Sequence, residues 1–401
     1  MRSDRRVVVT GLGAVTSIGI GKDAFWEGVT KGKSGISEVT AFDTSAFKCH
    51  RGGEVKSFNP ADFIPRRKVK FLGRASQLAI AAASLALTDA NLSSKDIPNK
   101  KVGVIIGTTT GERPMEDLVR SWAQSGLKDL DRAKIFQAAV NNISANVGIE
   151  FSATGLNYLI PTACAAGNYA LGYAYDQIQN GDLNFALAGG ADSFSHYAFA
   201  GFQRLYAMSP DICRPFDKNR KGMLLGEGAG ILLLESYESA RKRNTPIYAE
   251  VIGYGLSCDA FHPTIPKLEG IKKVMEKTFK DAAISPDEVD YVCAHGTGTT
   301  QNDKEESTAI NALFAGRKVP VSSIKSMLGH TMGAASALES IACCLAIKNS
   351  LIPPTINFET PDPDCDIDCV PNTPREADLK IVLNNSYAFG GNNCCVAFAK
   401  V

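Results

Sequence analysis

Several features that would each mark a class of protein are scarce or absent in this chain of 401 residues. It has five histidines, two tryptophans and no apolar run long enough to span a membrane. Its eleven cysteines include no CxxC pair, which argues against a zinc ribbon and against a dithiol redox centre. With 43 basic and 42 acidic residues, neither charge predominates, so we expect no general affinity for nucleic acid.

The first residues contain neither a secretion signal nor a good cofactor-binding loop. The segment MRSDRRVVVTGLG has three consecutive valines before its glycine, whereas a secretory signal needs a longer apolar stretch. We therefore expect a cytoplasmic protein with reduced cysteines. In GLGAVTSIG, Gly11 and Gly13 follow an apolar run, but Thr16 stands where a dinucleotide-binding loop has its third glycine. This mismatch argues against a nicotinamide or flavin site.

Short apolar runs alternate with alanine- and leucine-rich segments along the whole chain. The runs predict strands of sheets covered on both faces, at 7–9, 104–106, 185–187, 231–234, 251–252, 291–292, 381–383 and 395–398. The other segments predict helices at 75–91, 165–179, 270–283, 304–314 and 333–348. This mixture indicates an α/β protein. Its length suits two units, and the best candidate for their seam is near Thr245.

Cys164 stands where a strand is expected to turn into a helix. Residues 156–160 predict a buried strand, and a helical stretch without proline follows Cys164. Unpaired N–H groups and the helix dipole at such a helix start favour a thiolate, so we expect a lowered thiol pKa. This arrangement is typical of a nucleophile elbow with sulfur in place of oxygen. The alternative is a small structural residue, which is our interpretation of the other ten cysteines.

Two of the five histidines, His295 and His330, occur in similar glycine-rich segments. His295 opens HGTGT, and His330 lies in MLGHTMG before an alanine-rich helix. Strand exits of this kind commonly line a cleft. A neutral imidazole can transfer a proton or donate a hydrogen bond to a developing oxyanion. A single such histidine is usually structural, but two of them together with Cys164 favour a catalytic site.

The charged residues near these histidines have two interpretations. Lys325 follows a short β-branched run, as either a solvated strand end or the buried partner of an acid. Asp303 and Glu306 lie early in a predicted helix, where acids are favoured in any case. The histidines and cysteines form no HxH, HExxH or CxxC pattern, which argues against a metal site.

Seven motifs resemble those of the β-ketoacyl-(acyl carrier protein) synthases, the elongating ketosynthases of type II fatty acid and polyketide systems. The resemblance covers essentially the whole chain, and the motifs occur in the family's order. They are RRVVVTGLGAVTSIG, PTACAAG, RPFDKNRKGMLLGEGAG, HGTGTTQNDKEE, SIKSMLGHTMGAA, PPTINFETPDPDCD and NNSYAFGGNN.

The resemblance implies roles for the residues already singled out. Cys164 resembles the nucleophile that receives the acyl chain from the carrier's phosphopantetheine. His295 and His330 resemble the pair that supports decarboxylation of the malonyl extender and stabilises the resulting enolate. Lys325 resembles the family's active-site lysine, paired to the carboxylate of Glu306.

The resemblance also implies roles for three further residues of these motifs. Thr297 and Thr299 resemble the residues that hydrogen-bond the pantetheine arm. Phe389 resembles the gating aromatic residue beside the cysteine. Its backbone N–H, together with that of Cys164, would form the oxyanion hole.

The fold implied by the resemblance is thiolase-like, with two similar α/β halves stacked in alternating αβαβα layers. We place the halves at residues 1–245, which carry the nucleophile, and 246–401, which carry both catalytic histidines. The implied reaction is a decarboxylative Claisen condensation of malonyl-carrier-protein with the acyl group on the cysteine. The implied reaction needs no metal or redox cofactor. The phosphopantetheine is carried by the partner acyl carrier protein. Such enzymes are dimers.

Three features separate this chain from similar proteins with other functions. Thiolases use a second cysteine near the C-terminus as a base, whereas Cys394 and Cys395 are expected in a strand. The initiating synthases have asparagine where His330 stands here. Silent chain-length subunits lack the nucleophile. A thiolase and a silent subunit are therefore the less favoured alternatives.

Finer details bear on the choice between fatty acid and polyketide synthesis. QND at 301–303, SSIKSMLGH and TPDPDCD at 360–366 look closer to polyketide ketosynthases. AAG after Cys164 and the Tyr387-Ala388 pair depart from both groups, which leaves the shape of the acyl pocket open. We favour a polyketide or polyene pathway, in a heterodimer with a homologous chain-length-factor subunit that lacks the cysteine. Fatty acid elongation and a homodimer are the alternatives.

A basic cluster at the start of a predicted helix suits the acidic carrier protein of this family. It consists of Arg66, Arg67, Lys68, Lys70 and Arg74. Complementary charge speeds the encounter of such partners. The alternative is an ordinary solvated helix face.

Overall fold

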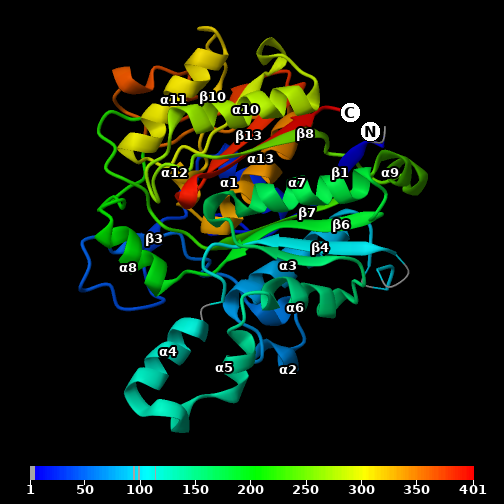
Figure 1. The fold of residues 1–401 in the computed structure, drawn as a ribbon, viewed down its shortest axis with the longest axis vertical. Helices are drawn as coiled ribbons and strands as arrows, with labels where there is room; N and C mark the ends of the chain where they lie inside the picture. The colour runs from blue at the N-terminus through cyan, green and yellow to red at the C-terminus, as the bar shows by residue number, and fades with distance from the viewer. Residues whose placement is uncertain (1–4, 94, 98–99, 113) are drawn as a thin grey trace.

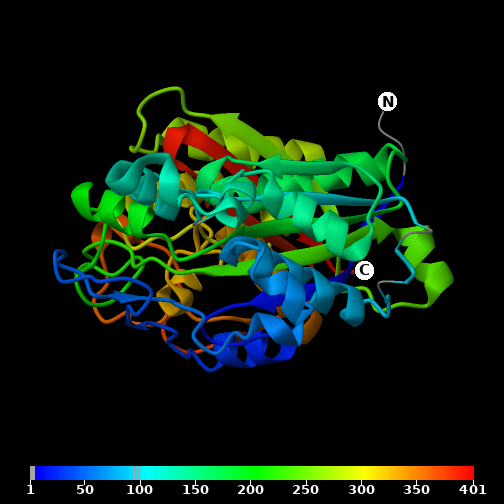
Figure 2. The same cartoon turned by 90° about the horizontal axis from the view of Figure 1, so that it is seen from below.

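Ten strands joined in a single hydrogen-bonded order form the centre of the protein (Figures 1 and 2). The structure is a computed structural model that describes residues 5–93, 95–97, 100–112 and 114–401. In order across the sheet, the strands are β10 (Val321–Ser322), β9 (Tyr291–Cys293), β13 (Ile381–Tyr387), β14 (Asn392–Ala399), β8 (Ala249–Cys258), β1 (Val7–Val15), β7 (Gly228–Ser236), β6 (Phe185–Asp192), β4 (Val102–Gly107) and β5 (Asn157–Ile160).

This strand order consists of two groups of five with the same topology. In one group β10, β9 and β13 are parallel, and β14 and β8 continue the group antiparallel. In the other group β5, β4 and β6 are parallel, and β7 and β1 continue it antiparallel. The first group comes entirely from residues after 245 and the second entirely from residues before it. We propose on this basis that residues 1–245 and 246–401 are the two halves.

Helices lie between and outside the two groups of strands, which gives five layers (Figure 1). The middle layer is α7 (Ala166–Gln179) and α13 (Ala335–Asn349); the outer layers are α10 (Leu268–Ala282) with α11 (Thr300–Leu313), and α3 (Arg74–Asp89) with α6 (Asn142–Phe151). This αβαβα arrangement is the thiolase-like fold that the sequence predicts. The structure also confirms the predicted helices, with ends that differ by a few residues.

The two middle helices are mostly buried, α13 more completely than α7. In α13, every residue from Ala335 to Ile347 is buried, in agreement with its mostly apolar sequence ASALESIACCLAI. Its contact with α7 is close, as Gly167 shows: a Cβ at this position would lie 2.8 Å from the backbone nitrogen of Ala337. This contact brings together the N-terminal ends of two helices that come from different halves of the chain.

The glycines of the GLG segment serve strand packing. Gly11 and Gly13 lie inside β1, and a Cβ at either position would fall 2.1 Å or 1.8 Å from a carbonyl oxygen of α3. The segment is therefore a surface on which α3 packs, and the chain continues as a strand where a dinucleotide loop would turn into a helix.

The structure corrects the prediction of a buried strand at 156–160. β5 is the last strand of the sheet, and β4 is its one neighbour. Asn157 and Tyr158 are exposed, the latter by 46%. The apolar pattern was interpreted as burial within one chain, whereas this edge is left uncovered by the described part of the chain.

The remaining elements surround this core, and α4 and α5 extend beyond it (Figure 1). The helices are α1 (Lys22–Thr30), α2 (Arg66–Val69), α4 (Pro114–Ser125), α5 (Arg132–Gln137), α8 (His196–Arg204), α9 (Tyr237–Arg243) and α12 (Lys325–Leu328); the small paired strands are β2 (Ser37–Glu38) with β3 (Arg51–Gly52) and β11 (Leu351–Ile352) with β12 (Arg375–Glu376). Within the described ranges, no helix combines the length and apolarity needed to cross a bilayer.

Candidate active site

Cys164 lies in a tight turn between β5 and the middle helix α7. The turn is a 3-10 helix, η3 (Ala163–Ala165), and Ala163 adopts a left-handed conformation with φ of 51°. Cys164 is the second residue of η3, so the helix itself provides no acceptor for its N–H. Its carbonyl accepts a hydrogen bond of 3.0 Å from the Ser386 hydroxyl of β13. The elbow predicted from the sequence is therefore present, and it is anchored to the other half of the molecule.

His330 occupies an equivalent turn before the other middle helix, α13. The 3-10 helix η5 (Met332–Ala334) begins with Met332 at φ of 57°, which directs its N–H to His330 Nδ1 at 3.1 Å. Because Nδ1 accepts this bond, the proton of the neutral ring is on Nε2. Nε2 is buried and has no hydrogen-bond partner among the described residues. It is a donor held ready for a ligand.

His295 follows β9, and a carboxylate holds the turn that it opens. Glu306 of α11 accepts the His295 N–H through Oε1 at 2.9 Å and the Gly296 N–H through Oε2 at 2.8 Å. The Gly296 carbonyl in turn accepts the Ser323 hydroxyl at 2.6 Å. A side chain at Gly296 would collide with Ser323, since a Cβ there would lie 2.6 Å from the serine Cβ. Glycine is required for this close approach.

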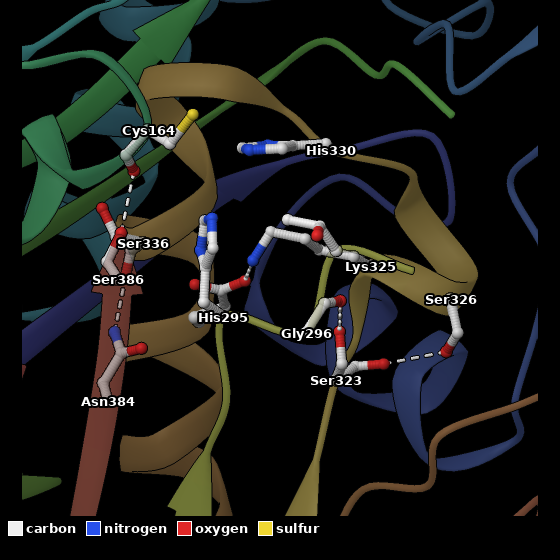
Figure 3. Close-up of polar contacts among 12 residues, drawn as sticks. Cys164, His295, Gly296, Ser323, Lys325, Ser326, His330, Ser336, Asn384 and Ser386 are labelled. Carbon is white, nitrogen blue, oxygen red and sulfur yellow. Dashed lines mark hydrogen bonds and ion pairs between the residues drawn. The ribbon is translucent and has the colours of Figure 1, made fainter. Parts of the chain in front are cut away.

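The structure brings these three residues together (Figure 3). Cys164, His295 and His330 are buried, and one nitrogen or sulfur atom of each lies within 4.8 Å of the others. The imidazole rings are 5.4 Å apart between centroids and nearly perpendicular, at 82°. The three residues that the sequence singled out thus form one cluster, although they are far apart along the chain.

Burial dominates the electrostatics of the thiol, and the predicted direction of its pKa was wrong. Removal from water raises the pKa of the Cys164 thiol to about 12, which Lys325 and the local N–H group oppose only in part. The sequence argument considered the helix start but not the depth of the site. The free enzyme therefore holds a thiol, and attack by sulfur must be accompanied by loss of its proton.

Burial acts in the opposite direction on the two imidazoles. The pKa of His295 and that of His330 lie well below the usual histidine range, first because of desolvation and next because of the Lys325 ammonium. Both rings are therefore neutral at pH 7. This agrees with the expectation that neutral imidazoles act as hydrogen-bond donors.

Lys325 has a different partner from the one expected. Its ammonium forms an ion pair with Glu339 of α13, and both side chains are buried. Glu306, the expected partner, instead accepts the two N–H groups of the His295 turn. Burial raises the pKa of each carboxyl to about 7. Glu339 left a signal in the sequence, since a lone acid inside an apolar helix requires a buried partner.

Cysteine and two histidines are also ligands for soft metal ions, but the donor set here does not suit one. A metal-bound imidazole normally donates its second ring N–H to an acceptor. His330 Nδ1 instead faces the N–H donor of Met332, so Nε2 cannot give up its proton to a metal while the ring stays neutral. The arrangement fits hydrogen-bond donation better than coordination.

A cavity of about 310 Å³ opens onto the cluster. Thr297 and Thr299 line it, with their hydroxyl oxygens 2.8 Å apart. Phe389 lines it as well and packs against Phe202, with ring centroids 5.3 Å apart. Phe389 begins a 3-10 helix, η7 (Phe389–Gly391), so its N–H also lacks an acceptor within the helix. All of these residues were singled out from the sequence, except Phe202.

Three other residues line this cavity; sequence reasoning noted Tyr387 only as a departure that bears on the shape of the acyl pocket, and gave no role to Lys221 or His262. Tyr387 packs its ring 5.6 Å from that of His295, and its buried hydroxyl has no partner in the described part of the chain. Lys221 and His262 also line the cavity. His262 Nδ1 accepts the N–H groups of the two residues that follow Pro263 in the rim loop, Thr264 at 3.1 Å and Ile265 at 3.2 Å. His262 is a lone histidine in a loop, so the sequence gave no sign that it lines the cavity.

The basic cluster is only partly free. Arg74 begins α3 half-buried and bonds Glu227 at 2.9 Å, while Lys68 pairs with Glu150 at 2.8 Å. Arg66, Arg67 and Lys70 are exposed. Arg74 and Lys68 each already have an acidic partner within this chain, and the docking role of the cluster stays a prediction.

Known proteins similar to this chain identify its family. Residues 4–240 match the model of the β-ketoacyl synthase N-terminal domain, and residues 248–359 match that of the C-terminal domain. The chain is 38% identical to 3-oxoacyl-[acyl-carrier-protein] synthase 2 of Synechocystis sp., covering 99% of this chain and 98% of that protein. It is 40% identical to nodulation protein E of Rhizobium leguminosarum bv. trifolii, over 99% and 100% of the two chains.

Two solved structures have the same fold over the full length. A chain of the ishigamide ketosynthase/chain length factor superposes with a TM-score of 0.97 and 44% identity, covering 100% of both chains. A type II polyketide ketosynthase, solved in complex with its acyl-carrier protein and bound to the hexaketide, gives 0.90 and 35%, covering 99% of both.

Proposed function

Since the chain belongs to the β-ketoacyl synthase family and is a ketosynthase, we propose that Cys164 carries the acyl substrate while His295 and His330 drive its condensation with a malonyl unit. One observation carries the proposal: the thiol and two neutral imidazoles meet in one buried cluster, with a ring N–H of His330 unpaired among the described residues. A nucleophile and preorganised donors are what this acyl-transfer chemistry requires.

The first step moves the acyl group from the carrier to the enzyme. Cys164 sulfur attacks the thioester carbonyl, and the bond between that carbonyl and the carrier's sulfur breaks. The thiol proton of Cys164 ends on the released pantetheine thiol, so the step is balanced. The N–H groups of Cys164 and Phe389 stabilise the oxyanion formed during the attack.

The second and third steps make the new carbon–carbon bond. The malonyl carboxylate leaves as CO2, and its electron pair moves onto the thioester oxygen, where the His330 Nε2–H and His295 donate hydrogen bonds. The resulting carbanion attacks the acyl carbonyl on Cys164, and the bond between that carbonyl and the cysteine sulfur breaks. The released thiolate takes up a proton from solvent, which restores the thiol of the free enzyme. Burial and, next to it, the positive charge of Lys325 oppose protonation of both imidazoles and keep them neutral.

We assign phosphopantetheine to the carrier protein and no metal or redox group to this chain. Thr297 and Thr299 are suited to hydrogen-bond the amide groups of the pantetheine arm, since their hydroxyls line the cavity. Phe389 gates the inner part of the cavity. Arg66, Arg67, Lys68, Lys70 and Arg74 are the proposed contacts of the acidic carrier.

We also propose that this ketosynthase functions as a dimer, through the side that carries β5. Of fifteen large apolar side chains exposed in the described residues, eight lie between 119 and 158. They are Val119, Trp122, Leu127, Ile135, Phe136, Val140, Ile149 and Tyr158. Exposed apolar side chains concentrated in the segment that leads into an open strand edge favour association with a second protein. A homologous chain-length subunit is the partner we favour.

A polyketide or polyene pathway is the more specific assignment that we favour, with fatty acid elongation as the alternative. The full-length likeness to the ishigamide ketosynthase/chain length factor supports the first. The likeness to 3-oxoacyl-[acyl-carrier-protein] synthase 2 supports the second. Elongation rates with saturated, polyunsaturated and β-keto acyl carriers, each with and without the homologous subunit, will separate the two.

The central experiment follows mass on both proteins after incubation with an acyl carrier and a malonyl carrier. We expect an acyl adduct on Cys164 and a β-ketoacyl product two carbons longer, both lost in Cys164→Ala. Cys258→Ala is the matched control, because this thiol is exposed and lies outside the cluster. An adduct that persists in Cys164→Ala would refute the proposed nucleophile. An adduct without elongation would indicate that the partner subunit is required.

A further inference from the structure

Four buried polar side chains tie the two middle helices to strand β13. They are Asn168 of α7, Ser336 and Ser340 of α13, and Asn384 of β13, and none is exposed to solvent. The Asn384 amide nitrogen lies 3.1 Å from Asn168 Oδ1, 2.8 Å from Ser340 Oγ and 2.8 Å from the Ser336 carbonyl oxygen. One side chain of β13 thus bonds to both middle helices.

Asn168 completes the connection between the two helices. Its backbone N–H donates to Ser336 Oγ at 3.0 Å, and its side-chain amide donates to the Asn384 carbonyl at 3.2 Å. Its Oδ1 also accepts the Ser340 hydroxyl at 3.1 Å. Every element in contact here is therefore joined to the other two by at least one hydrogen bond. Such bonds are directional, whereas apolar contacts between helices tolerate sliding.

This network lies next to the reacting groups (Figure 3). Asn168 is four residues after Cys164, and Ser336 is six residues after His330. On β13, Ser386 lies two residues beyond Asn384 and donates to the Cys164 carbonyl at 3.0 Å. The network thus lies where the helix that follows the nucleophile meets the helix that follows the imidazole donor.

We propose that Asn168 and Asn384 are positioning residues that hold Cys164 at the correct distance from His330 for carbon–carbon bond formation. The proposal rests on the roles assigned to Cys164 and His330 above. A misplacement of about 1 Å between reacting groups can lower a rate by about 10²-fold. The cluster's two parts come from different halves of the chain, so their distance depends on how the middle helices are held together.

The proposal separates two partial reactions. Decarboxylation of a malonyl carrier depends on the imidazoles, whereas condensation also depends on the distance from the carbanion to the acyl group on Cys164. Loss of the network should therefore slow condensation more than decarboxylation. A network that only stabilises the fold would lower the melting temperature and leave the ratio of the two rates unchanged.

The test compares Asn384→Leu, which has a similar volume but no amide, with a control elsewhere in the core. Thr278→Val is suitable, because Thr278 is fully buried and joins α10 to β14 through bonds to Val274 and Cys395 carbonyls. For each protein we would measure the melting temperature, CO2 release without an acyl donor, and a single turnover of condensation on pre-acylated enzyme. Ser340→Ala provides a milder variant in case Asn384→Leu does not fold.

In Asn384→Leu we expect condensation to fall about 10- to 100-fold, with decarboxylation within about threefold of the wild type. Ser340→Ala should show the same trend to a smaller extent, and Thr278→Val should lose only thermal stability. An unchanged ratio of rates in both network variants would overturn the proposal. Failure of the wild-type enzyme to form an adduct on Cys164 would instead refute the assigned nucleophile, so the two failures are distinguishable.

Discussion

The two turns that present the reacting side chains are built alike and are used differently. Each is a 3-10 turn whose first residue, Ala163 or Met332, adopts the left-handed conformation, and each leads into a middle helix. Cys164 comes one residue after the left-handed position, whereas His330 comes two residues before it.

This offset decides what each backbone N–H does. At the first turn, the N–H of Cys164 is left without an acceptor inside the 3-10 helix, so it can bind an oxyanion. At the second turn, the N–H of Met332 is donated to His330 Nδ1 and orients the ring. One local structure thus supports a nucleophile in one half of the molecule and a proton-bearing imidazole in the other.

The strongest test of this comparison is to remove each of the two partial reactions separately by mutation. We expect Cys164→Ala to abolish acyl transfer while decarboxylation continues. We expect His330→Phe to slow decarboxylation by about 10²- to 10⁴-fold while Cys164 still becomes acylated. Acyl adducts are measured by mass and CO2 release by a coupled assay. Loss of both reactions in each folded variant would show that the turns do not divide the chemistry.

Lys325 acts on both turns, so its removal should affect stability and pH dependence together. In Lys325→Met, Glu339 loses its buried partner, and we expect the free energy of unfolding to fall by about 3–5 kcal/mol. The pKa of both imidazoles should rise, because the cation that opposes their protonation is gone. The acid limb of decarboxylation should then move to higher pH. Denaturant titration and a pH–rate profile measure the two effects.

The lowered pKa values of the two histidines, caused first by burial and next by Lys325, also set the direction in which stability depends on pH. A histidine whose pKa is lower in the folded state contributes stability above its unfolded pKa of about 6.5, and this stability is lost as the pH falls. The acid-side loss should be smaller in Lys325→Met than in the wild type. An equal loss in both proteins would mean that desolvation alone sets the imidazole pKa values.

The raised pKa of the Cys164 thiol predicts how its reactivity depends on pH. Because burial raises the pKa of Cys164 to about 12, its alkylation by iodoacetamide should accelerate about tenfold per unit between about pH 7 and pH 9. The rate is followed by mass on a peptide containing Cys164. A plateau within this range would indicate that the helix start lowers the pKa after all.

The sequence predicts those parts of the site that depend on local structure. Cys164, His295 and His330 all follow apolar runs and are bounded by small residues or glycine, so their placement at strand exits could be inferred. The thiol pKa could not, because it depends on burial by both halves of the fold. The partner of Lys325 was missed for a similar reason, since Glu306 and Glu339 are both plausible along the chain and only packing distinguishes them.

The fold, like the site, has parts that the sequence predicts and parts that it does not. The strands and helices could be placed because their apolar patterns are local. The exposed edge at β5 was predicted to be buried, since an apolar strand has the same pattern whether its own chain or a partner covers it. The network of Asn168 and Asn384 left no separate signal, because each asparagine is an ordinary polar residue until the middle helices meet.

The smallest expected effect concerns the left-handed residue of the first turn. Ala163→Gly removes strain of about 1–2 kcal/mol, but glycine also gains entropy in the unfolded chain, worth about 0.4–1 kcal/mol. The net change in unfolding free energy should therefore lie between about zero and about 1.6 kcal/mol, on the stabilising side. Ala165→Gly, two residues on and at φ of −86°, lacks the strain and should destabilise by about 0.4–1 kcal/mol through the entropy that glycine gains in the unfolded chain. Denaturant titration measures the unfolding free energy of both variants. Equal destabilisation would mean that the left-handed geometry of the first turn stores no strain. The two turns would then be alike in shape alone.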